Sequence, residues 1–123
     1  MTEISHIKLE LAREPGHPEG SSEHGYDLHL PIDADGRIDA AAWRRQKKLC
    51  RVRKFSPGAE DRRGLILHGP GGRWLFDYTD ETVRDDEHAF NFQEERFVVG
   101  EYVSIRENDG VMHTFKVVAV RPE

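Results

Sequence analysis

The chain has 123 residues, enough for one ordinary domain and too few for two. Its net charge of −5 argues against a general attraction to nucleic acid or to an anionic membrane. A single cysteine excludes an internal disulfide, and no stretch approaches the roughly 20 apolar residues of a membrane helix. We therefore expect one cytoplasmic domain over residues 1–123, without a signal peptide.

Alternating apolar and polar residues predict two strands in the first part of the chain. Residues 6–12 place Ile7, Leu9 and Leu11 on one face, and residues 26–30 alternate in the same way. The Pro- and Gly-rich stretch between these strands predicts a long loop.

One helix is predicted, at about residues 39–50. Asp39 stands at its N-cap position ahead of a run of alanines, and basic residues near its end complement the helix dipole. Trp43, Leu49 and Cys50 can share one face, which we expect to pack against a sheet.

The aspartates before this helix superficially resemble a calcium-binding loop. If Gly36 takes the sixth position of such a loop, Pro31 falls on the first ligand position and Ala42 on the twelfth. Both of those ligands are then missing, so a turn followed by an N-cap is the better interpretation.

After the helix, the pattern is typical of strands separated by turns. Residues 65–68 and 73–78 flank a Gly-Pro-Gly-Gly stretch, which predicts a hairpin loop. This stretch lacks the Gly-Lys-Ser/Thr of a phosphate-binding loop. Residues 80–88 are acidic and predict a loop, whereas the aromatic stretch at 90–98 predicts no particular element.

Near the C-terminus, two β-rich runs flank Asn-Asp-Gly at residues 108–110, which predicts a β-hairpin. A two-residue loop would mix apolar and polar residues on both faces. A three-residue loop, with its glycine in the left-handed conformation, pairs Ile105 with His113 and Val103 with Phe115. Because a slip of one residue exchanges the two faces, we predict this second register.

These elements predict an α+β fold. It would be a small curved antiparallel sheet or partial β-barrel of six to eight strands, packed on one main helix at about residues 39–50. Repeated strand–helix alternation is absent, which disfavours a Rossmann-type fold.

A basic run without acidic residues spans the helix end and the following strand: Arg44, Arg45, Lys47, Lys48, Arg51, Arg53 and Lys54. Such a run could form a phosphate or polyanion site. A solvated helix face that complements the helix dipole, or pairing with the acidic stretch further on, is the better interpretation. Trp43 and Phe55 flank the run instead of alternating with it, which weakens a role in stacking bases.

The seven histidines raise the possibility of a metal site. They show no spacing typical of metal ligands, so only tertiary structure can bring them together. The hypothetical ligand set is His24, His29, His68, His113 and Cys50. Basic neighbours favour a reactive thiolate at Cys50, but no histidine base is adjacent, and we expect a packing thiol. His113 faces apolar neighbours in the predicted register, so we expect a hydrogen-bonded core histidine there.

Five short segments are distinctive: His6–Arg13, Pro18–Ser21, His24–Tyr26, Cys50–Arg53 and Gly100–Ile105. Together they resemble a family of small, uncharacterised bacterial proteins. The resemblance covers nearly the whole chain and implies a single cytoplasmic domain. It brings no assigned activity, cofactor or partner, so it transfers no functional residue.

The function that these residues favour is a non-enzymatic binding or interaction module for a small ligand or a protein partner. The absence of a catalytic signature and the segregation of basic from acidic stretches favour it. One alternative is a metal protein or enzyme whose site forms from the dispersed histidines. The other is polyanion or nucleic-acid binding through residues 44–54, with nucleic acid disfavoured by the net charge. No cofactor and no membrane partner are expected.

Overall fold

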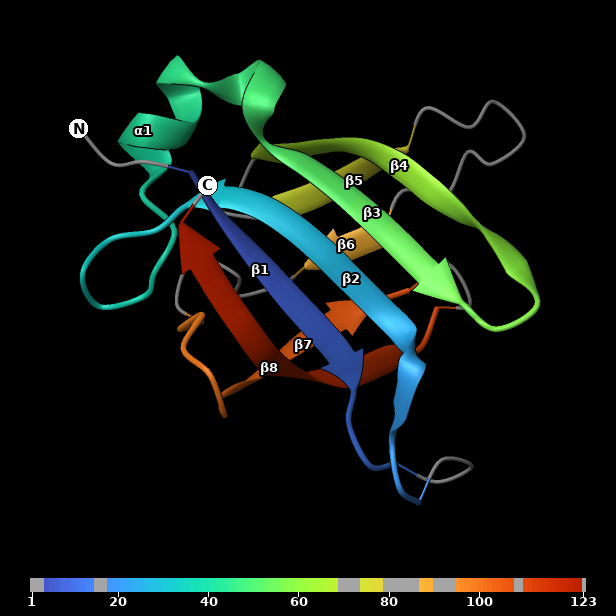
Figure 1. Ribbon diagram of the computed structural model, residues 1–123. Helices are drawn as coiled ribbons and strands as arrows, with labels where there is room; N and C mark the ends of the chain where they lie inside the picture. Colours follow the sequence, from blue (N-terminus) through green and yellow to red (C-terminus); the bar gives the residue numbers. More distant parts are fainter. Residues whose placement is uncertain are drawn as a thin grey trace.

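The computed structural model describes residues 4–14, 18–68, 74–78, 95–107 and 110–122, and the backbone of residues 87–89. In this part of the chain, eight antiparallel strands follow one another around a closed barrel (Figure 1). The strands are β1 (Ile4–Leu11), β2 (Ser21–Pro31), β3 (Arg51–Ser56), β4 (Ala59–His68), β5 (Trp74–Tyr78), β6 (Glu87–Ala89), β7 (Tyr102–Arg106) and β8 (Met112–Pro122). Two short helical segments separate β2 from β3: α1 (Ala40–Arg45) and the 3₁₀ turn η1 (Lys47–Leu49).

The predicted α+β fold with a main helix at 39–50 is wrong, because the fold is all-β in its organisation. Strand β1 pairs with β8, and Leu9 lies opposite Val117 in that pairing. The sheet therefore closes on itself and buries its apolar face in its own interior. A helix of six residues is too short to cover such a sheet, and α1 instead lies at one end of the barrel (Figure 1).

The core occupies the barrel interior and follows the alternation of the strands. The predicted inward residues Ile7, Leu9 and Leu11 are all buried. The largest fully buried side chains come from most of the strands and from the segment before β7: Trp74, Tyr26, Phe76, Phe97, Phe115, Ile7, Leu9, Leu28, Leu30, Ile66 and Ile105. An eight-stranded barrel is just wide enough for side chains to fill it, so this interior is a packed core.

Segment α1 plugs one end of the barrel. The Asp39 carboxylate accepts a hydrogen bond from the Ala42 amide at 3.0 Å, which confirms the predicted N-cap. Trp43 donates its indole N–H to the Ile66 carbonyl at 2.8 Å and packs edge-on against Trp74, with ring centroids 5.4 Å apart. The aromatic plug therefore seals the barrel at the end where β2 finishes and β3 starts.

The helix ends earlier than predicted. Its last residue is Arg45, and the chain then tightens into η1. The change of helical pitch leaves Trp43 and Cys50 buried but turns Leu49 outward, with 54% of its surface exposed. The prediction that Leu49 shares the buried face is therefore wrong.

The C-terminal hairpin has the predicted register. Val103 lies opposite Phe115, and Ile105 lies opposite His113. Gly110 has a φ of +79° and donates its amide to the Glu107 carbonyl at 2.9 Å, while the Glu107 amide bonds the Val111 carbonyl at 3.1 Å. These bonds define the three-residue loop with a bulge. The predicted register also places Val111 on the apolar face with Val103 and Phe115, and this part is wrong, because Val111 is exposed.

Other predictions fall partly outside the described residues. The hairpin between residues 65–68 and 73–78 is confirmed by the pairing of His68 with Trp74, while the loop at 69–73 lies outside the described part. The prediction of a loop over the acidic residues 80–88 is wrong at its end, because residues 87 and 88 belong to strand β6. Of the remainder, residues 80–86 lie outside the description.

Candidate functional site

Three charged side chains are buried in the described part of the chain: Asp27, Lys54 and Glu107. Burying a charge is costly unless partners compensate it, so each marks a place where the fold has assembled a polar cluster. Lys54 and Glu107 share one cluster inside the barrel, and Asp27 forms another on its outer surface.

The interior cluster lies at the end of the barrel opposite α1. Glu107 accepts hydrogen bonds from His24 at 3.1 Å and from the Tyr26 hydroxyl, and the Lys54 ammonium lies 3.3 Å from the same carboxylate. Burial by itself raises the pKa of Glu107, but these hydrogen bonds and the Lys54 charge outweigh it and lower the pKa to about 2. The carboxylate is therefore ionised and fully engaged by protein groups.

His113 extends this cluster toward the surface. Its Nδ1 is within 3.1 Å of both carboxylate oxygens of Glu14, and its Nε2 lies 3.7 Å from Glu107. The predicted core histidine is therefore half-buried and sits between two carboxylates. His24 lies close by, with its ring centroid 6.4 Å from that of His113.

The outer cluster lies on the face of β1–β4. A groove of about 310 Å³ runs across these four strands, and its charged and imidazole lining consists of His6, His29, Asp27, Arg51, Arg53 and Arg63. The alternation of each strand turns these side chains outward, and the antiparallel register brings them level with one another. The groove thus holds three arginines against one aspartate, in a chain whose net charge is −5.

Asp27 sits at the centre of the groove and ties its neighbours in place. Arg53 donates from Nε at 2.8 Å and from a terminal nitrogen to one Asp27 oxygen, and His6 bonds the other oxygen at 2.8 Å. Burial raises the pKa of Asp27, but the bonds from Arg53 and His6 prevail and hold it below its ordinary value. Arg53 also donates to Asp61 at 2.7 Å, so its charge is shared between two carboxylates.

The two histidines of the groove stack on each other. The rings of His6 and His29 are 4.8 Å apart and parallel to within 3°. Arg51 lies directly across from His29 on β3, and Arg63 lies across from Arg53 on β4. Both Arg51 and Arg63 are exposed, so two guanidinium groups and a stacked imidazole pair border the groove.

The predicted basic run is divided among three places. Arg44, Arg45, Lys47 and Lys48 lie on the exposed surface of α1 and η1. Arg51 and Arg53 border the outer groove. Lys54 points into the barrel, because it is the next residue along a strand and strand side chains alternate between faces.

The predicted metal ligands do not converge. His24 and His113 lie in the interior cluster, His29 lies in the outer groove, and His68 stacks on Trp74 at the plugged end with ring centroids 4.3 Å apart. No group of three or more potential ligands suited to a metal ion occurs among the described residues.

Cys50 lies apart from these histidines and is fully buried. Burial raises the pKa of its thiol to about 11, and the opposing charge of Arg51 does not offset this. The thiol donates to the Gln46 carbonyl at 3.4 Å, which is the behaviour of a packing cysteine.

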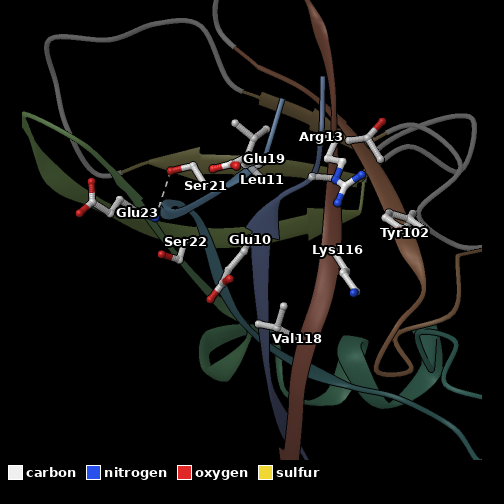
Figure 2. Close-up of a pocket in the computed structure, with 13 residues that line it drawn as sticks. Glu10, Leu11, Arg13, Glu19, Ser21, Ser22, Glu23, Tyr102, Lys116 and Val118 are labelled. Carbon is white, nitrogen blue, oxygen red and sulfur yellow. Dashed lines mark hydrogen bonds between the residues drawn. The ribbon is translucent and has the colours of Figure 1, made fainter. Parts of the chain in front are cut away.

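A second and larger groove, of about 970 Å³, lies outside β1, the start of β2 and β8 (Figure 2). Glu10 on β1 lies opposite Lys116 on β8, and Figure 2 shows Tyr102 beyond Lys116, at the side of the groove. The groove holds carboxylates and basic groups together, because Glu19 and Glu23 lie in the same lining as Arg13. This mixture favours no single charge of ligand, so the groove on β1–β4 is the stronger candidate site.

Sequence reasoning missed half of the charged and imidazole side chains of the outer site. His6, Asp27 and Arg63 were not among the predicted binding residues, and they come from three strands that are distant in the chain. The available signal was the alternation that turns each of them outward on its own strand. Their convergence required the register between strands, which the alternation alone does not specify.

The fold and site together define an eight-stranded antiparallel barrel with a cationic groove on its outer face. No protein-family model, curated protein or solved structure matches this chain. The resemblance to small uncharacterised bacterial proteins therefore stays a prediction. Within the described residues, no helix has the length and apolar character needed to span a membrane.

Proposed function

We propose that this protein is a binding module for a small anionic ligand that carries a phosphate or carboxylate group. The groove on β1–β4 is its binding site. The observation that supports this proposal is the convergence of three arginines and two histidines from four adjacent strands around one carboxylate. The single cysteine, a buried thiol, is consistent with a reducing compartment and supports a cytoplasmic location.

The chemistry of the lining favours an anion. A guanidinium group presents a planar set of N–H donors that matches the oxygens of phosphate and carboxylate, and it remains charged at every physiological pH. Arg51 and Arg63 are exposed at the groove, so an incoming anion can reach their guanidinium groups from solvent. Two such contacts give both attraction and orientation.

Asp27 plays a supporting part in this arrangement. It engages Arg53 and His6 and holds both side chains against the strands. The negative charge of Asp27 is thereby largely compensated within the protein. Arg51 and Arg63 line the same groove with their side chains exposed, and His29 lies beside them.

The size of the groove favours a small ligand. Its volume of about 310 Å³ lies at the lower end of the ~300–1,000 Å³ typical of small-molecule sites. The floor consists of Val52 and Gly64, which pair with each other across β3 and β4. An anionic group seated there would contact backbone and apolar surface below and guanidinium groups at the sides.

Titration calorimetry with inorganic phosphate and with pyrophosphate tests the proposal. We expect saturable binding that weakens as salt concentration rises, because the contacts are between exposed charges. Arg51→Gln and Arg63→Gln should each weaken binding by about five- to tenfold. Arg44→Gln and Lys48→Gln are the matched controls, because each removes one positive charge from α1 or η1, outside the groove.

Two results would contradict the proposal. One is the absence of binding to either anion at low salt. The other is an equal loss of affinity in the groove variants and in the α1 and η1 controls, which would indicate general charge attraction in place of a site.

A further inference from the structure

The groove belongs to a longer row of cationic and imidazole side chains that crosses four strands. Arg121 on β8 lies opposite His6 on β1, His6 lies opposite His29 on β2, and His29 lies opposite Arg51 on β3. These four residues occupy consecutive cross-strand positions. Arg121 does not line the groove itself, so the row extends beyond it on the β8 side.

The length of this row exceeds the size of one phosphate group. Neighbouring strands are about 4.8 Å apart, so four strands separate Arg121 from Arg51 by about 14 Å between backbones. Arg51 and Arg121 are both exposed and stand at the two ends of the row. The stacked rings of His6 and His29 lie between them. One orthophosphate, with a diameter well below this span, can contact one end of the row only.

We propose that the ligand is an oligophosphate-type anion, with at least two phosphate groups, that lies along this row from Arg51 to Arg121. This inference rests on the proposed function and deepens it by naming the ligand class. Arg121 is then a specificity-determining residue, because it contacts only a ligand long enough to leave the groove. His6 and His29 border the middle of such a ligand, and His29 can donate a ring N–H to its oxygens.

A single nucleic-acid strand fits the row less well. The lining of the groove contains no Phe, Tyr or Trp on which bases would stack. The ring of Phe55, on the same strand as Arg53, has Lys8 and Arg53 over it at 5.9 Å and 5.2 Å. The chain's net charge of −5 also opposes a long polyanion that must pass over the rest of the surface.

Calorimetry at one ionic strength with four probes tests the inference: orthophosphate, pyrophosphate, tripolyphosphate and a thymidine hexanucleotide. We expect tripolyphosphate to bind about tenfold or more tightly than orthophosphate, because it gains contacts beyond the groove. Arg121→Gln should weaken tripolyphosphate binding by about threefold to fivefold and leave orthophosphate binding unchanged. Arg45→Gln on α1 is the matched control and should change neither affinity.

The outcomes separate this inference from the proposed function. Two results would contradict the inference of an extended ligand and leave the proposed anion-binding function intact. One is equal affinity for orthophosphate and tripolyphosphate, and the other is an unchanged affinity for tripolyphosphate in Arg121→Gln. If the hexanucleotide binds more tightly than tripolyphosphate, the ligand class is nucleic acid and the inference is wrong. If no probe binds, both proposals fail.

Discussion

The interior cluster around Glu107 and the outer cluster around Asp27 are built from the same kinds of side chain. Each has one buried carboxylate that accepts hydrogen bonds from a histidine and lies beside a basic residue. They differ in what surrounds them. The partners of Glu107 are themselves largely buried, whereas the exposed guanidinium of Arg51 borders the Asp27 cluster.

This difference shows how burial separates a structural polar cluster from a binding site. Inside the barrel, Tyr26, His24 and Lys54 all point at the same carboxylate. On the outer face, one carboxylate engages Arg53 and His6, while further cations border a groove that faces solvent. We therefore expect changes in the interior cluster to alter stability and changes in the outer cluster to alter ligand affinity.

The largest expected effect comes from Glu107→Gln. It leaves the Lys54 ammonium buried without its anionic partner, so the free energy of unfolding should fall by about 3 kcal/mol. Urea denaturation measures this loss, and the exposed Glu101→Gln serves as a control that should change stability little. Phosphate affinity should be unchanged. A stability loss no larger than that of the control would show that the interior cluster is not structural.

Lowering the pH should reduce the stability that the interior cluster around Glu107 provides. The pKa of Glu107 in the folded protein, about 2, lies below its ordinary value of 4.5. The unfolded chain therefore binds the proton more readily, and the stabilisation is present above the ordinary value and lost as the pH falls from there toward 2. The loss should be on the order of 3 kcal/mol. Unfolding measured between pH 6 and pH 2 should show a steep decline that Glu107→Gln flattens, and parallel curves would contradict this assignment.

Asp27→Asn should change anion affinity more than stability, which is the opposite of the expectation for Glu107→Gln. Its contacts with Arg53 and His6 are partly exposed, so the loss of stability should be about 1 kcal/mol or less. Sulfate affinity should rise by about threefold, because the one carboxylate that lines the groove has been removed and Arg53 becomes available. A decrease in affinity would instead indicate that Asp27 is needed to position the groove.

Gly110→Ala tests the left-handed conformation at the end of the hairpin loop. The φ of +79° at Gly110 penalises a Cβ atom, although no heavy atom would lie within 4 Å of it. The cost should be about 1 kcal/mol and should arise from backbone strain alone. Gly110→Asn should cost less, since asparagine tolerates this conformation better. Equal stability of the glycine and alanine proteins in denaturant would contradict the left-handed loop.

The smallest effect concerns the stacked imidazole pair in the groove. His6 and His29 both line it, and His29 lies opposite Arg51 on β3. An imidazole N–H can donate to an anion, so His29→Ala should weaken sulfate binding by about twofold. An unchanged affinity in calorimetry would remove His29 from the site.

Local features of this fold were predictable because they depend on residues close together in the chain. The N-cap at Asp39, the inward faces of the first strand and the bulged hairpin before Met112 all follow from short-range patterns and turn chemistry. The length of the helix was not predictable from propensity, because the chain must leave α1 in time to bring Cys50 to the start of β3. The contact between Trp43 and Trp74 is the tertiary interaction that fixes α1 against the end of the barrel.

The candidate site was predictable only in part, and Lys54 shows why. The sequence placed it with Arg51 and Arg53 in one basic run, but alternation along β3 sends Lys54 into the barrel and the two arginines outward. The same rule applied to β1, β2 and β4 would have identified His6, Asp27 and Arg63 as outward residues. Alternation alone would not have predicted that these three residues lie in one groove.

The sequence by itself determined which residues of the first strand face inward, where the helix begins and how the last two strands pair. Only the tertiary structure decided that β1 meets β8 and closes the barrel, and that Arg121, His6, His29 and Arg51 stand level with one another. The physical reason is the distance along the chain over which each interaction acts. Turns and alternation act over a few residues, whereas closure and cross-strand rows depend on the relative register of segments that lie up to the length of the chain apart.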